Sequence, residues 1–263
     1  MRFDYHTHTP LCHHAVGEPS DYVRAAQAAG LEEIGFADHN PMPTQFDDWR
    51  MAPEDLPRYV EMIQATQKSF APYPVRLGLE CDFIPGYEDH IRWLSHQAPW
   101  DYLIGSVHYI SPDWDVDNPK HMKRWEEYPV EAIWEAYFSA YAQMAASGLY
   151  DFLGHPDLVK KFGRFPEGDL MRFYKPALEA LGDYRCVIEL NTAGLRKDCR
   201  EIYPTLSFLI EARKRGVRIL INSDAHAPNE VGLNFEEARA LAREAGYDRL
   251  TRFIQREAVE TPL

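Results

Sequence analysis

Two histidines near the N-terminus have the spacing of a metal site. His6 and His8 lie two residues apart and follow a short segment, residues 2–5, that the pattern predicts to be a strand. Alternate residues of an extended chain point to the same side, so both imidazoles face one way. Imidazole is the commonest metal-binding side chain and suits zinc, iron and similar ions. Alone, the pair is a weak signal for a metal site, because a strand that ends in two solvated histidines has the same H-x-H sequence.

The rest of the chain strengthens this signal. Metal-capable side chains recur where predicted strands end, and they are His39, Glu80, His108, His155, Asp224 and His226. Together with the first pair they are too many for one zinc ion, which usually takes four ligands. Such a set fits two or three ions that share a bridging carboxylate and a hydroxide formed near neutral pH. The sequence therefore predicts a cluster of divalent ions.

The elements that must position these residues alternate between strand and helix. We expect strands at 2–5, 33–37, 75–79, 101–107, 150–154, 185–190 and 217–221. We expect helices at 19–30, 57–70, 87–96, 129–147, 169–181, 204–215 and 234–245, polar loops at 40–55 and 111–128, and a short tail. Seven such repeats predict parallel strands with right-handed crossovers, which fit an open sheet or a closed barrel. The polar strand ends favour a barrel of one domain, residues 1–263, because barrels place their chemistry on that face.

Composition narrows the class of protein. The 263 residues are 45% hydrophobic, enough for one large core, and the net charge of -13 argues against a nucleic-acid partner. Four cysteines without a C-x-x-C pair favour a reducing cytoplasm. We find no signal peptide and no run near the roughly 20 apolar residues of a membrane helix. We therefore expect a cytoplasmic protein.

Longer motifs connect the candidate ligands to a known family. They are His6-Thr7-His8-Thr9-Pro10-Leu11-Cys12-His13-His14, Ala37-Asp38-His39-Asn40, Gly78-Leu79-Glu80-Cys81-Asp82, Gly105-Ser106-Val107-His108, Gly154-His155-Pro156-Asp157, Glu189-Leu190-Asn191-Thr192-Ala193-Gly194-Leu195-Arg196-Lys197 and Ser223-Asp224-Ala225-His226. With these motifs the sequence resembles the polymerase and histidinol phosphatase (PHP) superfamily of metal-dependent phosphoesterases. Within it, the chain is similar to the monofunctional histidinol-phosphate phosphatases. The motifs span residues 6–226 in family order.

The resemblance implies a distorted (β/α)7 barrel of the TIM type with a trinuclear site at the carboxyl ends of its strands. One ion would take His6, His8, Glu80 and Asp224, and a second would take Glu80 as a bridge with His108 and His155. A third would take His14, His39 and His226. The ions, two or three in number, would be zinc, iron or manganese. His14 occupies the family's ligand position, although the family usually has a small residue where His13 stands.

The implied reaction is the hydrolysis of L-histidinol phosphate to L-histidinol and phosphate in histidine biosynthesis. We expect a hydroxide that bridges the ions to attack phosphorus in line, with His39, Asp224 and Arg196 acting in catalysis. Arg196 and one of Lys160 or Lys161 would hold the phosphate, since arginine binds it bidentately and lysine as a point charge. Asn191 is a further candidate contact. The acidic balance suggests that one of Glu18, Asp47, Asp48 and Asp82 holds the ammonium or imidazole group of the substrate.

Three other readings fit parts of the sequence. A related phosphoesterase would act on a nucleotide or another phosphate monoester, and a metal-binding module would bind ions without turnover. A metal-dependent amidohydrolase also begins with H-x-H, but it normally has eight strands and often a bridging lysine. Here the third strand ends in Glu80 and no predicted strand ends in lysine. The sequence does not determine an oligomeric state, and the aromatic loops at 44–50 and 109–128 suit either lids or interface patches.

Overall fold

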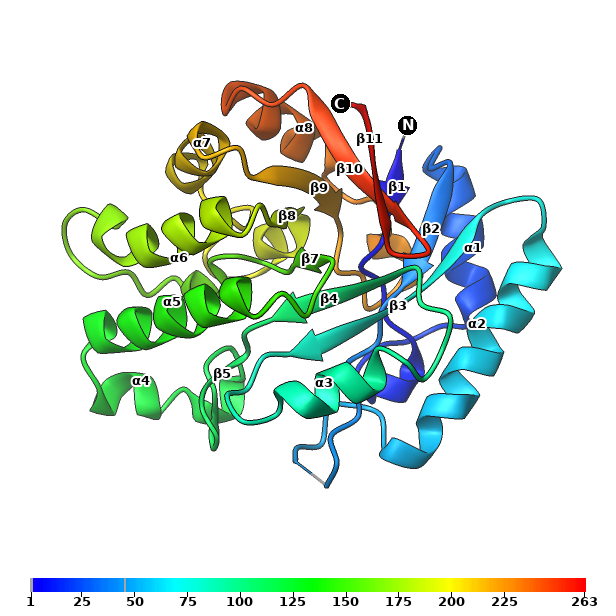
Figure 1. The fold of residues 1–263 in the computed structure, drawn as a ribbon, viewed down its shortest axis with the longest axis horizontal. Helices are drawn as coiled ribbons and strands as arrows, with labels where there is room; N and C mark the ends of the chain where they lie inside the picture. Colours follow the sequence, from blue (N-terminus) through cyan, green and yellow to red (C-terminus); the bar gives the residue numbers. More distant parts are fainter. Residues whose placement is uncertain (1, 45) are drawn as a thin grey trace.

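Seven parallel strands form the centre of the molecule. The computed structural model describes residues 2–44 and 46–263, so residue 45 of the expected loop at 40–55 lies outside the described part. The strands lie side by side in the order β1 (Phe3–Asp4), β2 (Glu33–Phe36), β3 (Val75–Asp82), β4 (Tyr102–Ser106), β7 (Phe152–Leu153), β8 (Val187–Asn191) and β9 (Arg218–Asn222). Figure 1 shows the helices arranged around this sheet.

The first and last strands of the sheet meet just beyond their ends. Thr7 and Ala225 form a parallel bridge, and the His8 amide donates to the Ala225 carbonyl at 2.9 Å. The Tyr5 amide also donates to Oδ1 of Asn222 at 2.8 Å. These contacts bring the sheet close to a closed barrel, so the expected TIM-like architecture is confirmed.

In the part of the chain that the structure describes, seven helices connect the strands. They are α1 (Pro19–Ala28), α2 (Leu56–Phe70), α3 (Glu88–Leu94), α5 (Val130–Ser147), α6 (Met171–Asp183), α7 (Leu206–Lys214) and α8 (Phe235–Glu244). The longest, α5, begins after Pro129 and ends at Gly148, whose φ of 65° suits glycine. Within residues 2–44 and 46–263, no helix combines the length and apolar character needed to cross a membrane.

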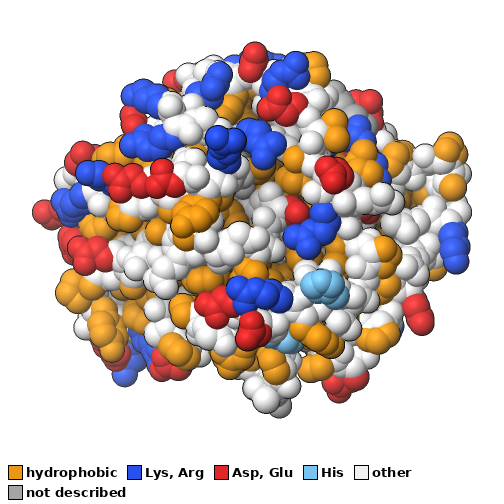
Figure 2. Space-filling model, in the orientation of Figure 1, with side chains coloured by type: hydrophobic (Ala, Val, Ile, Leu, Met, Phe, Trp, Pro, Cys, Tyr) orange, Lys and Arg blue, Asp and Glu red, His pale blue; other side chains and the backbone are white. Residues whose placement is uncertain are grey.

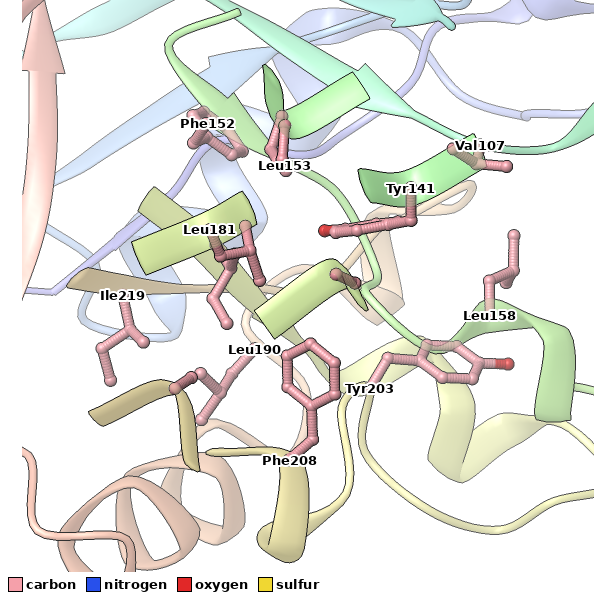
Figure 3. Close-up of a cluster of buried hydrophobic side chains, with 14 of the residues drawn as sticks. Val107, Tyr141, Phe152, Leu153, Leu158, Leu181, Leu190, Tyr203, Phe208 and Ile219 are labelled. Carbon is pink, nitrogen blue, oxygen red and sulfur yellow. The ribbon is translucent and has the colours of Figure 1, made fainter. Parts of the chain in front are cut away.

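The apolar face of α5 explains why it packs on the barrel. Aromatic and aliphatic side chains recur along one side of this helix and are buried, including Trp134, Tyr137 and Tyr141. Figure 3 shows Tyr141 near Leu181 of α6, Leu190 of β8 and Phe208 of α7. This cluster is the larger part of the core, and it supports the strands that carry the second half of the candidate ligands.

Two expectations for irregular chain were wrong. The loop at 111–128 contains β6 (Trp114–Asp115), which pairs with β5 (Tyr109–Ser111), and the short helix α4 (Arg124–Glu127). The tail forms an antiparallel hairpin of β10 (Arg249–Ile254) and β11 (Glu257–Pro262). β11 is almost wholly exposed and therefore lacks the buried alternation that marks a strand in sequence.

The hairpin covers the end of the barrel where the strands begin. The backbone amides of Gln255 and Arg256 both donate to Asp101, which precedes β4, at 3.1 and 2.8 Å. The Phe253 ring stacks on Phe152 of β7 with 5.5 Å between centroids. We infer that residues 1–263 form one domain, because this C-terminal hairpin closes a barrel that starts at β1. The opposite end, where the strands finish, stays open to ligands.

The acidic excess of the chain is unevenly spread. On the face drawn in Figure 2, lysine and arginine side chains gather over α7 and α8. The basic residues of these two helices include Arg213, Lys214, Arg239 and Arg243. Acidic and basic groups are mixed elsewhere on this face. The net charge of -13 is therefore a poor guide to the potential at any one site.

Candidate metal centre

Glu80, near the end of β3, is the centre of the candidate ligands. Its Oε2 atom lies 2.8 Å from Nδ1 of His39 and 3.3 Å from Nε2 of His6. Its Oε1 atom lies 3.1 Å from Nε2 of His155 and 3.7 Å from Nε2 of His108. Its Oε2 atom also lies 3.7 Å from Nε2 of His8, so five imidazoles from four strand ends surround one buried carboxylate, which is the arrangement a bridging ligand needs.

Asp224 approaches the same region from the loop after β9. Its Oδ1 atom lies 3.3 Å from Nε2 of His8 and 3.8 Å from Nε2 of His6. The φ of Asp224 is 52°, a left-handed conformation that costs a residue with a Cβ on the order of 1–3 kcal/mol. Asn191 and Arg196 hold this conformation, since the Asn191 amide donates to Asp224 Oδ2 at 3.2 Å and Arg196 Nη2 donates to the Asp224 carbonyl at 3.1 Å. The carboxylate is thus aimed at the histidine pair.

The remaining histidines gather at the mouth of the site. The His14 ring lies 4.5 Å from the His226 ring and 5.4 Å from the His39 ring, measured between centroids. The neighbouring His13 has a φ of 64° and an exposed side chain, and it belongs to none of the possible ligand groups among the described residues. The structure therefore brings together all nine predicted ligands, with His14 rather than His13 in the cluster.

The unpaired atoms of this cluster fit divalent ions. His6 Nε2, His8 Nε2, His39 Nδ1, His226 Nε2 and Glu80 Oε2 are buried and lack a hydrogen-bond partner among the described residues. Buried polar atoms normally have partners, so this concentration requires an explanation. Zinc bonds to nitrogen and oxygen are about 2.0–2.2 Å long, so two ligands of one ion lie roughly 3–4 Å apart. The spacings of 3.1–3.8 Å around Glu80 and Asp224 match that range, and the 2.8 Å between Glu80 Oε2 and His39 Nδ1 is shorter.

Carboxylates face the far sides of three histidines. Glu189 and Asp38 were not assigned a role from the sequence, and Asp82 was expected as a candidate contact for the substrate rather than for a histidine. Nδ1 of His6 lies 3.0 Å from Glu189, Nδ1 of His8 lies 3.6 Å from Asp38, and Nδ1 of His108 lies 2.7 Å from Asp82. Such outer partners fix the ring orientation of a metal-binding histidine. Glu189 and Asn191 are polar residues two positions apart on a buried strand. This pattern was the sequence signal that could have identified Glu189 as a residue that supports the site.

These carboxylates also change the acidity of the imidazoles. Burial acts to lower the pKa of His108, but the charge of Asp82 outweighs it and raises the pKa to about 10. Burial likewise opposes protonation of His8, while Asp224 and Asp38 raise its pKa to about 9. For Glu80, burial favours the neutral acid, but His6 and His39 bring its pKa well below the usual range. In the protein without metal, the Glu80 carboxylate is therefore ionised and lies among imidazolium groups whose place a metal cation could take.

Cationic side chains line a cavity of about 250 Å³ beside the candidate ligands. Arg196 donates through Nη2 to the Ser223 and Asp224 carbonyls, while its Nη1 is buried without a partner among the described residues. Lys161 also lines this cavity and pairs with Asp117 at 2.8 Å. Lys197, which sequence reasoning missed, lines it too, and burial and the nearby charge of Lys161 lower its pKa. The lining also includes Asp117, Asp224 and Glu230, and Glu230 pairs with Arg196 Nε at 3.2 Å, so the buried Nη1 is the Arg196 donor that remains for an anion.

The structure places two expected substrate contacts away from this cavity. The Lys160 side chain is fully buried, and its Nζ lies 3.0 Å from Asp157, 3.0 Å from Glu201 and 2.8 Å from the Ile202 carbonyl. Asn191 uses its amide group on Glu189 and Asp224, and its Oδ1 accepts from the Ala193 amide. Both side chains support neighbouring loops, so Lys161 is the better placed of the two lysines.

A second cavity of about 450 Å³ adjoins the first and shares His14, His39, His108, Asp117 and Lys161 with it. Its lining adds Trp49, Asp48 and Asp115. Trp49 stands edge-on to the His39 ring at 4.7 Å and donates from Nε1 to Asp115 at 3.0 Å. The cavity combines an aromatic face with carboxylates, so it suits a planar or cationic group.

The four acidic residues expected to hold the substrate's cationic groups have different surroundings. Asp47 and Asp82 both pair with the buried Arg50, and Glu18 lies at the start of α1. Asp48 alone among these four lines the second cavity, where it pairs with Lys120 at 2.6 Å. Asp115 and Asp117 lie at the same cavity and were not among the expected residues.

Comparison with known proteins adds independent evidence. Residues 4–193 match the family model described as PHP domain. A probable histidinol-phosphatase of Deinococcus radiodurans is 42% identical over 245 residues, which cover 92% of this chain and 93% of that protein. A histidinol-phosphatase of Bacillus subtilis is 32% identical and covers 89% of this chain and 96% of its own. The crystal structure of a histidinol phosphate phosphatase from Lactococcus lactis, in complex with zinc, L-histidinol and phosphate, matches with a TM-score of 0.84 and 25% identity over 98% of both chains.

Proposed function

The chain belongs to the PHP family, and we propose that it is a histidinol-phosphatase that hydrolyses L-histidinol phosphate to L-histidinol and phosphate. The observation that carries this proposal is the match over 98% of the chain to the Lactococcus lactis protein, which binds zinc, L-histidinol and phosphate. The cavity with Arg196, Lys161 and Lys197 beside the nine candidate ligands supports the same reaction, because hydrolysis of a phosphate monoester uses cations that bind the phosphate and metal ions that activate water.

The nine clustered residues would hold two or three divalent ions. We assign His6, His8, Glu80 and Asp224 to one position, Glu80, His108 and His155 to a second, and His14, His39 and His226 to a third. Zinc, iron and manganese all suit imidazole and carboxylate ligands. When bound, the ions neutralise charge on the phosphoryl oxygens and lower the pKa of a water molecule.

The residues of the first cavity would bind the phosphoryl group. Arg196 is rigid, because two carbonyls hold its Nη2, and its unpaired Nη1 is available to an oxygen of the ester. Lys161 and Lys197 contribute further positive charge from the same wall. Preorganised cations of this kind stabilise the charge that develops at phosphorus in the transition state.

The second cavity would receive the alcohol portion of the substrate. L-Histidinol has a primary amine and an imidazole ring, both of which can be cationic. Asp48, Asp115 and Asp117 supply negative charge there, and Trp49 supplies an aromatic wall. The proposal also includes a cytoplasmic location, where the four cysteines, all free in the structure, would stay reduced.

A substrate panel with metal analysis tests the proposal. The purified protein is assayed with L-histidinol phosphate, several nucleotides and an aryl phosphate, before and after chelation. We expect L-histidinol phosphate to be preferred by orders of magnitude and chelation to abolish turnover. Preference for another ester would make the chain a different PHP phosphoesterase. Bound metal without any turnover would indicate a binding module instead.

A further inference from the structure

Glu189 connects two histidines that belong to different proposed ion positions. This residue is fully buried on β8, and both of its oxygens lie within 3.1 Å of Nδ1 of His6. The backbone amide of His155 donates to Glu189 Oε1 at 2.9 Å. The two imidazoles face the two oxygens of Glu80, at 3.3 Å for His6 and 3.1 Å for His155. The His6 ring therefore lies between Glu189 and Glu80, whereas His155 contacts Glu80 through its ring and Glu189 through its backbone amide.

The position of Glu189 is set by two asparagines. Asn191 Nδ2 donates to its Oε1 at 2.8 Å, and Asn222 Nδ2 donates to its Oε2 at 2.7 Å. With His6 and the His155 amide, the carboxylate has four donors and cannot turn without losing one of them. No lysine or arginine pairs with Glu189 among the described residues, so its charge is directed at the site.

The other outer carboxylates lack this double contact. Asp38 faces His8 at 3.6 Å, and Asp82 faces His108 at 2.7 Å while it also pairs with Arg50 at 2.9 Å. Each of them supports one candidate ligand. Glu189 contacts the ring of one candidate ligand, His6, and the backbone amide of a second, His155. These two ligands belong to the two proposed ion positions that Glu80 bridges.

We propose that Glu189 is a positioning residue that couples the two ion positions on either side of Glu80. It orients the His6 ring and places the His155 loop, so its loss weakens binding at both positions together. The inference rests on the proposed metal centre. Outer partners of metal-binding histidines typically contribute about 10–100-fold in metal affinity. The third proposed position, at His14, His39 and His226, has no contact with Glu189 and keeps its affinity.

The test is a titration of chelated, refolded protein with Co²⁺ and with Zn²⁺. Glu189→Gln removes the charge and leaves the size of the side chain almost unchanged. Glu33→Gln is the matched control, because Glu33 is equally buried in a strand but contacts Tyr5 and Arg76 at the other end of the barrel. We expect Glu189→Gln to lose about 10–100-fold in affinity for two ions and to alter the visible spectrum of bound Co²⁺. The control should match the wild type in both respects.

A second variant tests the same proposal if Glu189→Gln folds poorly. Glu189→Asp keeps the charge but withdraws it by one methylene, and it should also weaken two ions together. Wild-type affinities and an unchanged Co²⁺ spectrum in both variants would overturn the inference while leaving the proposed function intact. Failure of both variants to fold even with metal would make Glu189 a structural residue only, which also overturns it. If the wild type binds no metal, the proposed function itself fails.

Discussion

His39 Nδ1 and Glu80 Oε2 lie 2.8 Å apart, yet neither atom has a hydrogen-bond partner among the described residues. The two residues form a backbone bridge between neighbouring strands, so the contact is built into the barrel. The contact therefore places the carboxylate that bridges the first two proposed ion positions beside a ligand of the third.

Replacement of Glu80 tests this relationship. Glu80→Ala removes the carboxylate that faces five imidazoles, so at least two ions should be lost. Phosphatase activity should fall by more than about 1,000-fold, which exceeds the usual loss when one hydrogen-bond donor to the transition state is removed. Metal content per chain and turnover are measured together. Glu257→Ala, on the exposed β11, is the control and should behave like the wild type. Full metal content in Glu80→Ala would refute the central role of this residue.

Metal binding should release protons. Asp38 and Asp224 raise the pKa of His8 to about 9 against the effect of burial, and Asp82 raises that of His108 to about 10. Both imidazoles are therefore protonated at pH 7 in the metal-free protein and must lose a proton to bind an ion. Zinc affinity should rise from pH 6 to pH 8. Calorimetry in buffers of different ionisation enthalpy measures the released protons, and a buffer-independent enthalpy would contradict the expectation.

Lys161 should affect substrate binding without affecting metal content, whereas Arg196 should affect turnover and also the position of Asp224, because its Nη2 holds the Asp224 carbonyl. Lys161→Met removes one cation from the phosphate cavity and should raise KM by roughly tenfold, the effect of about 1.4 kcal/mol of lost binding. Arg196→Lys keeps the charge but loses the planar group, so kcat/KM should fall further. Steady-state kinetics with L-histidinol phosphate check both. A normal kcat/KM in Arg196→Lys would exclude arginine as a phosphate contact.

Lys160 should matter for stability rather than for substrate binding. Lys160→Met leaves Asp157 buried without its cation, and removal of one partner of such a pair typically costs about 3–5 kcal/mol. Urea denaturation should show this loss in the free energy of unfolding, and KM at low temperature should stay near the wild-type value. A raised KM with unchanged stability would restore Lys160 as a substrate contact.

The C-terminal hairpin should stabilise the barrel from the end opposite the site. Phe253→Ala removes a buried ring that stacks on Phe152, and such substitutions typically cost about 3–5 kcal/mol. Thermal denaturation measures the loss. At a temperature where the variant stays folded, its kcat should equal that of the wild type. A loss of kcat there would connect the hairpin to the site.

The order of the elements and the positions of the candidate ligands could be predicted from local patterns. Each buried strand has a run of apolar residues, and His39, Glu80, His108 and His155 come near or just beyond such runs. Parallel strands end at one edge, so these residues had to lie near one another. The chemical identity of the ligands then indicated a metal centre.

Other features depend on contacts between distant parts of the chain. His6 and Glu189 meet across 183 positions of sequence, and neither neighbourhood alone indicates the other. Lys160 is the last residue of a short 3-10 helix and Lys161 follows it as the C-cap, so their side chains diverge and only packing decides which one faces the cavity. The hairpin after α8 could not be predicted because one of its strands is exposed and lacks a periodic pattern. Local sequence thus determined which side chains could bind a metal, and closure of the barrel decided which of them, and which supporting carboxylates, come into contact.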